Sequence, residues 1–493
     1  MTDHTMKKNP VSIPHTVWYA DDIRRGEREA ADALGLTLYE LMLRAGEAAF
    51  LVCRTAYPDA RHWLGCGHGN NGGDGYVVAR LAKAVGIEVT LLAQESDKPL
   101  PEEAALAREA WLNAGGEIHA SNIVWPESVD LIVDALLGTG LQQAPRESIS
   151  QLIDHANSHP APIVAVDIPS GLLAETGATP GAVINADHTI TFIALKPGLL
   201  TGKARDVTGQ LHFDSLGLDS WLAGQETKIQ RFSAEQLSHW LKPRRPTSHK
   251  GDHGRVVIIG GDHGTAGAIR MTGEAALRAG AGLVRVLTRS ENIAPLLTAR
   301  PELMVHELTM DSLTESLEWA DVLVIGPGLG QQEWGKKALQ KVENFRKPML
   351  WDADALNLLA INPDKRHNRV ITPHPGEAAR LLGCSVAEIE SDRLHCAKRL
   401  VQRYGGVAVL KGAGTVVAAH PDALGIIDAG NAGMASGGMG DVLSGIIGAL
   451  LGQKLSPYDA ACAGCVVISF FCVSFMLFSL IQMIYFSTFS TRG

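Results

Sequence analysis

Short apolar runs alternate with amphipathic helical segments along most of the chain. In the first half the runs lie at His62–Cys66, Val89–Leu92, Leu131–Asp134, Ile163–Asp167 and His188–Ile193, with helical patterns such as Gly75–Val85 and Glu102–Ala114 between them. Ahead of these, Asp21 or Asp22 can cap a helix ending near Ala33, and Leu38–Ala49 has apolar residues at helical spacing. This alternation predicts right-handed crossovers and a mostly parallel sheet with helices on both faces.

A second α/β series follows a break in the apolar pattern. Its strand candidates are Arg255–Ile259, Leu283–Leu287, Val322–Ile325, Met349–Trp351, Val370–Thr372, Val407–Leu410 and Val416–Ala419. Charged residues and prolines between about residues 224 and 250 mark an interdomain connection with one short helix. We therefore expect domains at 1–223 and 251–465, a linker with the entry to the second domain at 224–250, and an atypical tail at 466–493.

Length, charge and cysteines narrow the classes of function. A chain of 493 residues is too long for one core, and its net charge of −9 comes without a basic patch. We expect no nucleic-acid partner and a small-molecule substrate. The seven scattered cysteines are typical of a reducing cytoplasm, and Cys462 with Cys465 forms a lone CxxC without a second pair. The polar first residues lack the apolar core of a signal peptide.

The tail after Cys465 differs from the rest in composition. No charged residue occurs from Val466 to Phe489, and the segment is long enough to cross a bilayer. It can be a frame-shifted terminus, a membrane anchor or a buried helix. We favour the frame shift because the segment lacks flanking Lys or Arg, so a membrane partner is expected only if the tail is a real anchor. A frame-shifted terminus would compromise the support of the preceding helix.

A glycine-rich turn follows the first strand of the first domain. Residues 67–75 read Gly-His-Gly-Asn-Asn-Gly-Gly-Asp-Gly ahead of a helix, and Gly67, Gly69 and Gly72 match a GxGxxG spacing. With Glu95 near the end of the next strand, this weak signal allows a dinucleotide-dependent oxidoreductase or merely a tight turn. Three polar side chains within the turn, Asn70, Asn71 and Asp74, indicate that it also binds an ion or a sugar.

Two further strand ends carry carboxylates. Asp134 lies in VDALLGTG and Asp167 in VDIPSG, which also contains Ser170. Carboxyl ends of parallel strands meet at one edge, where ligands of open α/β sheets bind. A lone strand-end aspartate is usually a helix cap, but three such loops predict one ligand crevice.

In this order NNGGDG, VDALLGTG and VDIPSG resemble the NAD(P)H-hydrate epimerases, the family also called YjeF-N, across about residues 15 to 222. The resemblance implies a Rossmann-like three-layer domain with Asp167 as acid/base, and a potassium ion on Asn71, Asp134 and Ser170. Leu43 departs from the acidic residue usual in the family. The implied substrate contacts are Asn70, Asn71, Gly72, Gly73, Asp74, Gly138, Thr139, Gly140, Leu141, Gln142, Gln143, Ala144 and Asp167.

Epimerisation suits such a site. The hydrated carbon carries a hydroxyl beside a ring nitrogen, so its configuration inverts if the C–O or C–N bond opens and recloses on the other face. Only protons move, a single carboxylate such as Asp167 suffices, and potassium would orient oxygens rather than act as a strong Lewis acid.

The second domain contains the stretch Asn431 to Asp441, a glycine-rich loop that opens an apolar helix. Gly437, Gly438 and Gly440 let backbone N–H groups converge, and the helix dipole adds positive potential, so the loop predicts an anion site. Asp441 either caps the helix or removes a proton from the group that attacks a phosphate.

Other glycine turns, with DADALN, HPGE and KGAGT, precede this loop without a Walker A sequence. Their order resembles the ribokinase-like superfamily, and within it the ADP-dependent NAD(P)H-hydrate dehydratases (YjeF-C), from about residue 228 to 465. The resemblance implies a ribokinase-like α/β domain with ADP as co-substrate, magnesium accompanying the ADP, and Asp441 as base for transfer of a phosphoryl group to the substrate hydroxyl. The implied contacts with the hydrate are Gly328, Gly330, His374, Pro375, Gly376, Glu377, Ala378, Ala379, Arg380 and Asp441. The implied nucleotide contacts are Lys411, Gly412, Ala413, Gly414, Thr415, Asn431, Ala432, Gly433, Met434, Ala435, Ser436, Gly437, Gly438, Met439 and Gly440.

Together the two resemblances imply repair of hydrated NADH and NADPH. One domain would interconvert the R and S hydrates, and the other would convert the S form to NAD(P)H, giving AMP and phosphate. We expect a homo-oligomer. The alternative is a ribokinase-like vitamin or sugar kinase fused to a non-catalytic Rossmann-like interaction module, which the intact Asp167 disfavours.

Overall fold

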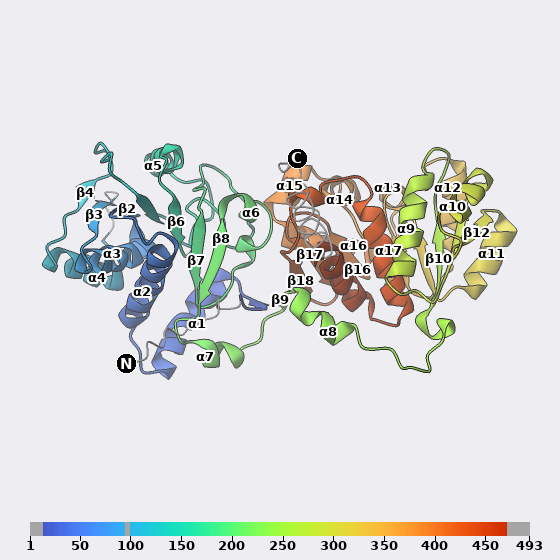
Figure 1. Cartoon of the computed structure of the whole chain (residues 1–493), viewed down its shortest axis with the longest axis horizontal. Helices are drawn as coiled ribbons and strands as arrows, with labels where there is room; N and C mark the ends of the chain where they lie inside the picture. Colours follow the sequence, from blue (N-terminus) through green and yellow to red (C-terminus); the bar gives the residue numbers. More distant parts are fainter. Residues whose placement is uncertain (1–12, 94–98, 471–493) are drawn as a thin grey trace, which may run out of the picture. The chain divides into compact units, whose positions relative to one another are not determined.

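A computed structural model describes residues 13–93 and 99–470. The chain divides into two compact units, Met1–Gln230 and Arg231–Gly493. Each unit contains its own sheet with helices packed against it (Figure 1). The predicted α/β class is confirmed in both units.

The first unit is built on a parallel sheet with strand order β4-β3-β2-β5-β6-β7-β8. Its strands are β2 His62–Gly67, β3 Glu88–Ala93, β4 His119–Ala120, β5 Leu131–Ala135, β6 Ile163–Val166, β7 His188–Phe192 and β8 Gln210–Asp214. Its main helices are α1 Ala20–Ala33, α2 Leu38–Ala56, α3 Gly69–Ala84, α4 Glu102–Asn113 and α5 Glu147–Ser158, with short α6 Ala204–Val207 and α7 Asp219–Ala223. A small antiparallel pair joins β1 Thr16–Val17 to β9 Ile229–Arg231.

Two apolar layers enclose this sheet. Residues of α1, α2 and α3 pack with Val133, Val164 and Ile190 on one face, and residues of α5 pack with Ile132 and Ile163 on the other. Central strands β5 and β6 are buried along their whole length, which explains their unbroken apolar sequences. The strands β4 and β8 were not predicted, because one is two residues long and the other is a partly exposed edge with mixed polarity.

Two helix starts differ from the predictions. Helix α1 begins at Ala20, so Asp21 and Asp22 lie in its first turn and pair with Arg24 and Arg25 instead of capping it. Helix α3 begins at Gly69, so the polar residues of the glycine motif lie in its first turns rather than in a preceding loop. The first turn of α3 packs closely against the end of β2. A Cβ on Gly72 would lie only 3.1 Å from the Gly67 carbonyl carbon, so glycine suits this position.

The second unit has a larger sheet with strand order β18-β17-β16-β15-β14-β13-β10-β11-β12. Pairing is parallel from β16 to β12, whereas β16, β17 and β18 are antiparallel. The strands are β10 Arg255–Ile259, β11 Leu283–Thr288, β12 Met304–Glu307, β13 Val322–Ile325, β14 Met349–Trp351, β15 Arg369–Ile371, β16 Val407–Leu410, β17 Thr415–Ala419 and β18 Ala423–Ile427. The edge strand β12 and the hairpin strand β18 were not predicted.

Helices cover both faces of this sheet (Figure 1). They are α8 Leu237–Trp240, α9 Ala266–Arg278, α10 Ile293–Ala299, α11 Met310–Trp319, α12 Glu333–Val342, α13 Asp354–Ile361, α14 Pro375–Leu382, α15 Val386–Ser391, α16 Arg393–Tyr404 and α17 Met439–Gly452, with 3-10 turns η2 Ala234–Gln236, η3 Lys250–His253, η4 Ser290–Asn292 and η5 Ala432–Met434. Helices α9 and α17 pack against each other and share a core with β10 and β13.

The chain after α17 is helical again over residues 457–470. Ala460 to Cys465, Val466 and Ile468 are buried in the core that α17 and β10 share. The start of the apolar tail therefore contributes to this core. The remainder of the tail, from residue 471 on, lies outside the described residues, as does Glu95.

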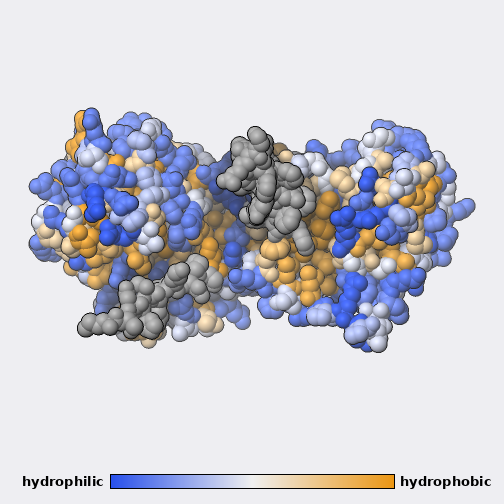
Figure 2. Space-filling view, in the orientation of Figure 1, coloured by the Kyte–Doolittle hydropathy of each residue, from blue (hydrophilic) through white to orange (hydrophobic). Residues whose placement is uncertain are grey.

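In the part of the chain described here, no helix combines the length and apolar character needed to span a bilayer. The face in Figure 2 is largely hydrophilic, with smaller apolar areas interspersed.

The backbone packs closely around Gly326, directly after β13, so substitution of this glycine tests the packing at the strand ends of the second unit. Its φ is 129°, and a Cβ there would lie 1.7 Å from the Asp352 carbonyl oxygen. We expect Gly326→Ala to lower the free energy of unfolding of this unit by about 2–4 kcal/mol through backbone strain and overpacking. Gly267→Ala, where a Cβ meets nothing within 4 Å, is the matched control and should change it by less than about 1 kcal/mol. Calorimetric melting of both variants measures the difference, and equal melting would contradict this packing.

Candidate active sites

A pocket of about 470 Å³ opens at the carboxyl edge of the first sheet. The loops that follow β2, β5, β6 and β7 form one side, and α1 and α2 form the other. Because these four strands are parallel neighbours, their ends must meet here. The predicted convergence of the strand-end loops is therefore confirmed.

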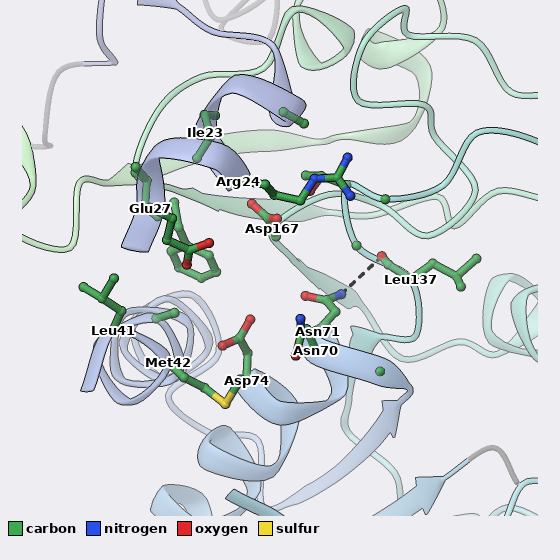
Figure 3. Close-up of a pocket in the computed structure, with 18 of the residues that line it drawn as sticks. Ile23, Arg24, Glu27, Leu41, Met42, Asn70, Asn71, Asp74, Leu137 and Asp167 are labelled. Atoms are coloured by element: carbon green, nitrogen blue, oxygen red, sulfur yellow. Dashed lines mark hydrogen bonds between the residues drawn. The ribbon is translucent and has the colours of Figure 1, made fainter. Parts of the chain in front are cut away.

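Asp167 stands directly after β6 with its backbone in the left-handed region, at φ 67°. Its carboxylate accepts hydrogen bonds from Lys196 Nζ at 2.8 Å and from Thr191 Oγ1 at 3.0 Å. The Lys196 side chain is only 4% exposed, and its ammonium also donates to Thr191 Oγ1 and to the Phe192 carbonyl oxygen. This ion pair and the hydrogen bond from Thr191 fix the direction of the Asp167 carboxylate, which faces the pocket (Figure 3).

Two further carboxylates, Asp74 from α3 and Glu27 from α1, point into the same pocket (Figure 3). Burial, together with the negative charges of Asp167 and Glu27, raises the pKa of Asp74 well above its usual range. Burial and the charge of Asp167 also raise the pKa of Glu27. The pocket thus contains one carboxylate paired with a lysine and two whose pKa values are raised, that of Asp74 well above its usual range.

Asn71 lines the pocket, and the polar residues Asp134 and Ser170 are buried beneath this lining. Ser170 donates to Asp134 from its hydroxyl at 2.6 Å and from its backbone N–H at 2.8 Å. The Asn71 amide donates to the carbonyl oxygens of Leu137 and Val166. Burial raises the pKa of Asp134 to about 6 despite the hydrogen bonds from Ser170. Among the described residues no group of three or more His, Cys, Asp or Glu could hold a metal ion.

The other residues expected to contact a ligand in this unit fall into three groups. Asn70 and the segment Gly138, Thr139, Gly140 and Leu141 line the pocket. Gly72 faces the backbone of Gly67, and a Cβ on Gly73 would meet the Met42 side chain. Gln142, Gln143 and Ala144 continue the Gly138 loop and are exposed. Asp134 and Ser170 are buried beneath the lining.

Sequence reasoning missed Lys196 and Glu27. Lys196 follows an otherwise apolar run, and a buried lysine at a strand end indicates a charged partner nearby. Glu27 carries no such signal, because it reaches the pocket only through the docking of α1.

A second cluster of charged residues lies at the carboxyl edge of the second sheet. Asp352 follows β14 and Lys411 follows β16, and Lys411 Nζ lies 3.2 Å from Asp352 Oδ1. Asp352 is 2% exposed, and its other oxygen accepts a hydrogen bond from Ser444 Oγ of α17 at 2.9 Å. Buried Arg393 donates to the carbonyl oxygens of Leu410 and Lys411 and so fixes the start of the KGAGT turn.

Asp441 lies in the first turn of α17, where Gly438 occupies the N-cap position with φ 93°. No side chain caps this helix, so the capping role considered for Asp441 is wrong. Burial and the charge of Asp352 raise the pKa of Asp441 to about 6, and Lys411 opposes the shift. Although burial disfavours an ammonium, Asp352, Glu377 and Asp441 raise the pKa of Lys411.

Gly440 fits closely into this cluster, since a Cβ there would lie 3.0 Å from Lys411 Nζ. The preceding loop is mostly exposed, and Asn431 accepts a hydrogen bond from the Gly433 N–H at the start of η5. A Cβ on Gly437 would meet nothing within 4 Å. The loop thus presents backbone to solvent beside the half-buried Lys411, which suits an anionic ligand.

The remaining predicted residues lie at neighbouring strand ends. The Gly330 N–H donates to Asp354 at 2.9 Å, and the Gly328 carbonyl oxygen accepts from Asp262 N–H and Thr265 Oγ1. His374 and Glu377 form a capping box at the start of α14, with Pro375 and Gly376 between them. Burial, with the charges of Asp352 and Lys411 acting in opposite directions, raises the pKa of Glu377. Ala378 and Ala379 are buried, whereas His374 and Arg380 are exposed.

Comparison with known proteins assigns a family description to each half. Residues 38–198 match a family described as YjeF-related protein N-terminus, and residues 256–472 match one described as NAD(P)H-hydrate dehydratase. The second match ends past Cys465.

Two curated relatives match along most of the chain. The bifunctional NAD(P)H-hydrate repair enzyme Nnr of Escherichia coli (strain K12) is 98% identical over 467 residues, which cover 94% of this chain and 91% of that protein. A bifunctional NAD(P)H-hydrate repair enzyme of Leishmania braziliensis is 48% identical, covering 92% of this chain and 88% of its own length. Among solved structures, the ADP/ATP-dependent NAD(P)H-hydrate dehydratase from Bacillus subtilis, co-crystallised with ATP/Mg²⁺, has a TM-score of 0.43 at 29% identity and covers 48% of this chain and 85% of that chain.

The raised pKa of Asp441 predicts that its ionisation lowers the free energy of unfolding as pH rises. Its pKa is about 6 in the folded chain against an ordinary value of 3.8, so the folded state binds this proton more tightly than the unfolded state. Ionisation therefore destabilises the fold increasingly as pH rises from about 4 to about 6. We expect Asp441→Asn to be more stable by about 1–2 kcal/mol above pH 6, allowing for partial exposure, with the gain disappearing as pH falls to about 4.

Thermal melting across this pH range measures the effect. Asp311→Asn, which removes an exposed carboxylate from the first turn of α11, controls for the loss of charge at a helix start and should show no such pH-dependent gain. A stability difference for Asp441→Asn that is constant with pH would contradict the desolvated carboxylate.

Proposed function

This chain belongs to the family of bifunctional NAD(P)H-hydrate repair enzymes, and we propose that its two reactions occur at the two clusters described above. The R and S hydrates of NADH and NADPH interconvert in the pocket of the first unit. The S hydrate is dehydrated at the strand ends of the second unit with ADP as co-substrate. One observation supports this division more than any other: each unit gathers a lysine-paired aspartate and a protonation-prone carboxylate at the carboxyl edge of its parallel sheet.

In the first unit Asp167 is the base. Its ionised carboxylate faces the pocket, with Lys196 and Thr191 fixing its direction. It removes the proton of the substrate hydroxyl, so that a carbonyl forms and the bond to the ring nitrogen opens. Return of the nitrogen to the other face of that carbonyl inverts the configuration, and the proton is given back. Asn70 and the Gly138–Leu141 segment line the pocket beside Asp167 and hold the hydrated nicotinamide ring and the phosphates of the dinucleotide.

The cluster of Asn71, Asp134 and Ser170 suits a potassium ion. Its amide, carboxylate and hydroxyl oxygens come from the start of α3, the end of β5 and the loop after β6, and hard cations take oxygen ligands. Asp134 is 1% exposed and faces no described cation within ion-pair distance, so a monovalent ion would offset its charge. Bound there, potassium would orient substrate oxygens from behind the pocket lining.

In the second unit Asp441 is the base and the loop from Asn431 to Gly440 holds ADP. Hydroxide leaves poorly, so a phosphoryl group is first transferred from ADP to the substrate hydroxyl, which leaves AMP. The ring nitrogen then expels phosphate, and loss of a proton from the adjacent ring carbon gives NAD(P)H. Backbone N–H groups of Gly437 to Gly440 and the ammonium of Lys411 stabilise the charge that shifts during transfer. Magnesium accompanies the phosphates of ADP.

The kinase alternative is not favoured. Both halves match repair-enzyme family descriptions, and the bifunctional relatives align over more than nine-tenths of the chain. The pocket of the first unit, with its ordered Asp167–Lys196 pair, also disfavours a non-catalytic interaction module.

A mixture of R and S hydrates tests both assignments in one protein. With ADP, the unmodified chain should consume both hydrates and restore the absorbance of the reduced nicotinamide ring. Asp167→Asn should consume only the S hydrate, and Asp441→Asn should interconvert the hydrates without restoring that absorbance, each with its affected rate lowered about 10²–10⁴-fold. Chromatography of the two hydrates measures both rates. Loss of both activities in either variant, in a folded protein, would contradict two independent sites.

A further inference from the structure

We propose that Asp74 is a second catalytic residue of the first unit, the proton donor that acts opposite the base Asp167. This inference rests on the proposed epimerisation and adds a residue to it. Its basis is the way the three pocket carboxylates are partnered.

The reaction needs a donor as well as an acceptor. When Asp167 removes the hydroxyl proton, the O–H electron pair forms the carbonyl and the C–N electron pair moves onto the ring nitrogen. That nitrogen then requires a proton, which Asp74 supplies from its carboxyl group. After the carbonyl presents its other face, the nitrogen attacks, Asp74 recovers its proton and Asp167 returns the other one to the oxygen. No redox partner or net proton is needed.

The hydrogen-bond pattern separates the two carboxylates. Asp167 accepts from a lysine ammonium and a threonine hydroxyl, an environment that stabilises its anion. In the described parts of the chain no side-chain hydrogen bond or ion pair reaches the carboxylate of Asp74. It projects from the first turns of α3 beside Asn70 and Asn71, across the cavity from Asp167 (Figure 3). The Asp74 carboxyl group points into the pocket without a side-chain partner among the described residues and is therefore available to exchange a proton with the substrate.

The charges around Asp74 favour its protonated form. Burial makes the largest contribution to raising the pKa of Asp74. Asp167 at the end of β6 and Glu27 of α1 raise it further, whereas Lys196 lowers it. Glu103 of α4 and Arg24 of α1 also line this pocket. Two neighbouring carboxylates of opposite protonation state provide an acid and a base at one pH.

Glu27 is the competing candidate. It too lacks a hydrogen-bond partner among the described residues, and its pKa is raised. However, it comes from α1, whereas Asp74 is part of the turn that contributes Asn70 and Asn71 to the pocket. We therefore assign to Glu27 the role of a charge that keeps Asp74 protonated.

Asp74→Asn is the decisive variant, because an amide has the shape of a protonated carboxyl group and still donates a hydrogen bond, but cannot give up a proton. We expect its kcat for hydrate interconversion to fall about 10²–10⁴-fold with little change in KM. The decline of the rate at high pH that deprotonation of Asp74 causes in the unmodified enzyme should be absent.

Glu27→Gln should keep its rate within about tenfold and move that decline to lower pH, since removal of a facing negative charge lowers the pKa of Asp74. Glu29→Gln, on an exposed position of the same helix, is the matched control and should change neither rate nor pH profile. Dehydration of the S hydrate with ADP by each preparation, together with its melting curve, shows that the variants are folded.

Near-normal interconversion by Asp74→Asn would overturn the proposal, because a structural hydrogen bond would then suffice. A large loss confined to Glu27→Gln would overturn it in favour of Glu27. If the unmodified chain dehydrates the S hydrate but never converts R to S, the proposed epimerisation itself is wrong.

Discussion

A lysine ion-paired with a strand-end aspartate occurs in both units, and each site depends on it. Lys196 Nζ lies 2.8 Å from Asp167, and Lys411 Nζ lies 3.2 Å from Asp352. A single charge at the buried edge of a parallel sheet is costly, whereas a hydrogen-bonded pair is tolerated. The pair therefore lets a carboxylate remain ionised where strand ends, helix starts and ligand meet.

Burial instead raises the pKa of the described site carboxylates that form no ion pair with a lysine. Asp74 in the first unit and Asp441 in the second both have raised pKa values, because each is desolvated and faces the negative member of the pair. The two sites use this arrangement differently. In the first, the paired Asp167 faces the ligand as base. In the second, the paired Asp352 is buried, and its charge adds to the effect of burial in raising the pKa of Asp441 at the start of α17.

Much of this was predictable from local sequence. Central strands such as β5, β10 and β13 are buried on both faces, so their apolar runs were recognisable, and the parallel order then required Asp134 and Asp167 to meet at one edge. Glycine motifs located the helix starts only approximately. Helix α3 begins inside its motif, because the contact between Gly67 and Gly72 is set by tertiary packing.

The charged partners were less predictable. Lys196 lies 29 residues from Asp167 and Lys411 lies 59 residues from Asp352, and no spacing rule joins residues across different crossovers. The contribution of Glu27 depends on where α1 docks, and α1 has no motif. The N-cap of α17 is Gly438 because a left-handed backbone is needed there, which left Asp441 free to serve the site instead of the helix.

A neutron structure of the unliganded enzyme, from deuterated crystals at about pH 5, directly tests whether each site combines an ionised, lysine-bound aspartate with a protonated carboxyl group. It reveals the hydrogen positions on each carboxyl group and each lysine. We expect a deuteron on Asp74 and on Asp441, none on Asp167 or Asp352, and fully deuterated ammonium groups on Lys196 and Lys411. A bare Asp74 together with a protonated Asp167 would contradict it.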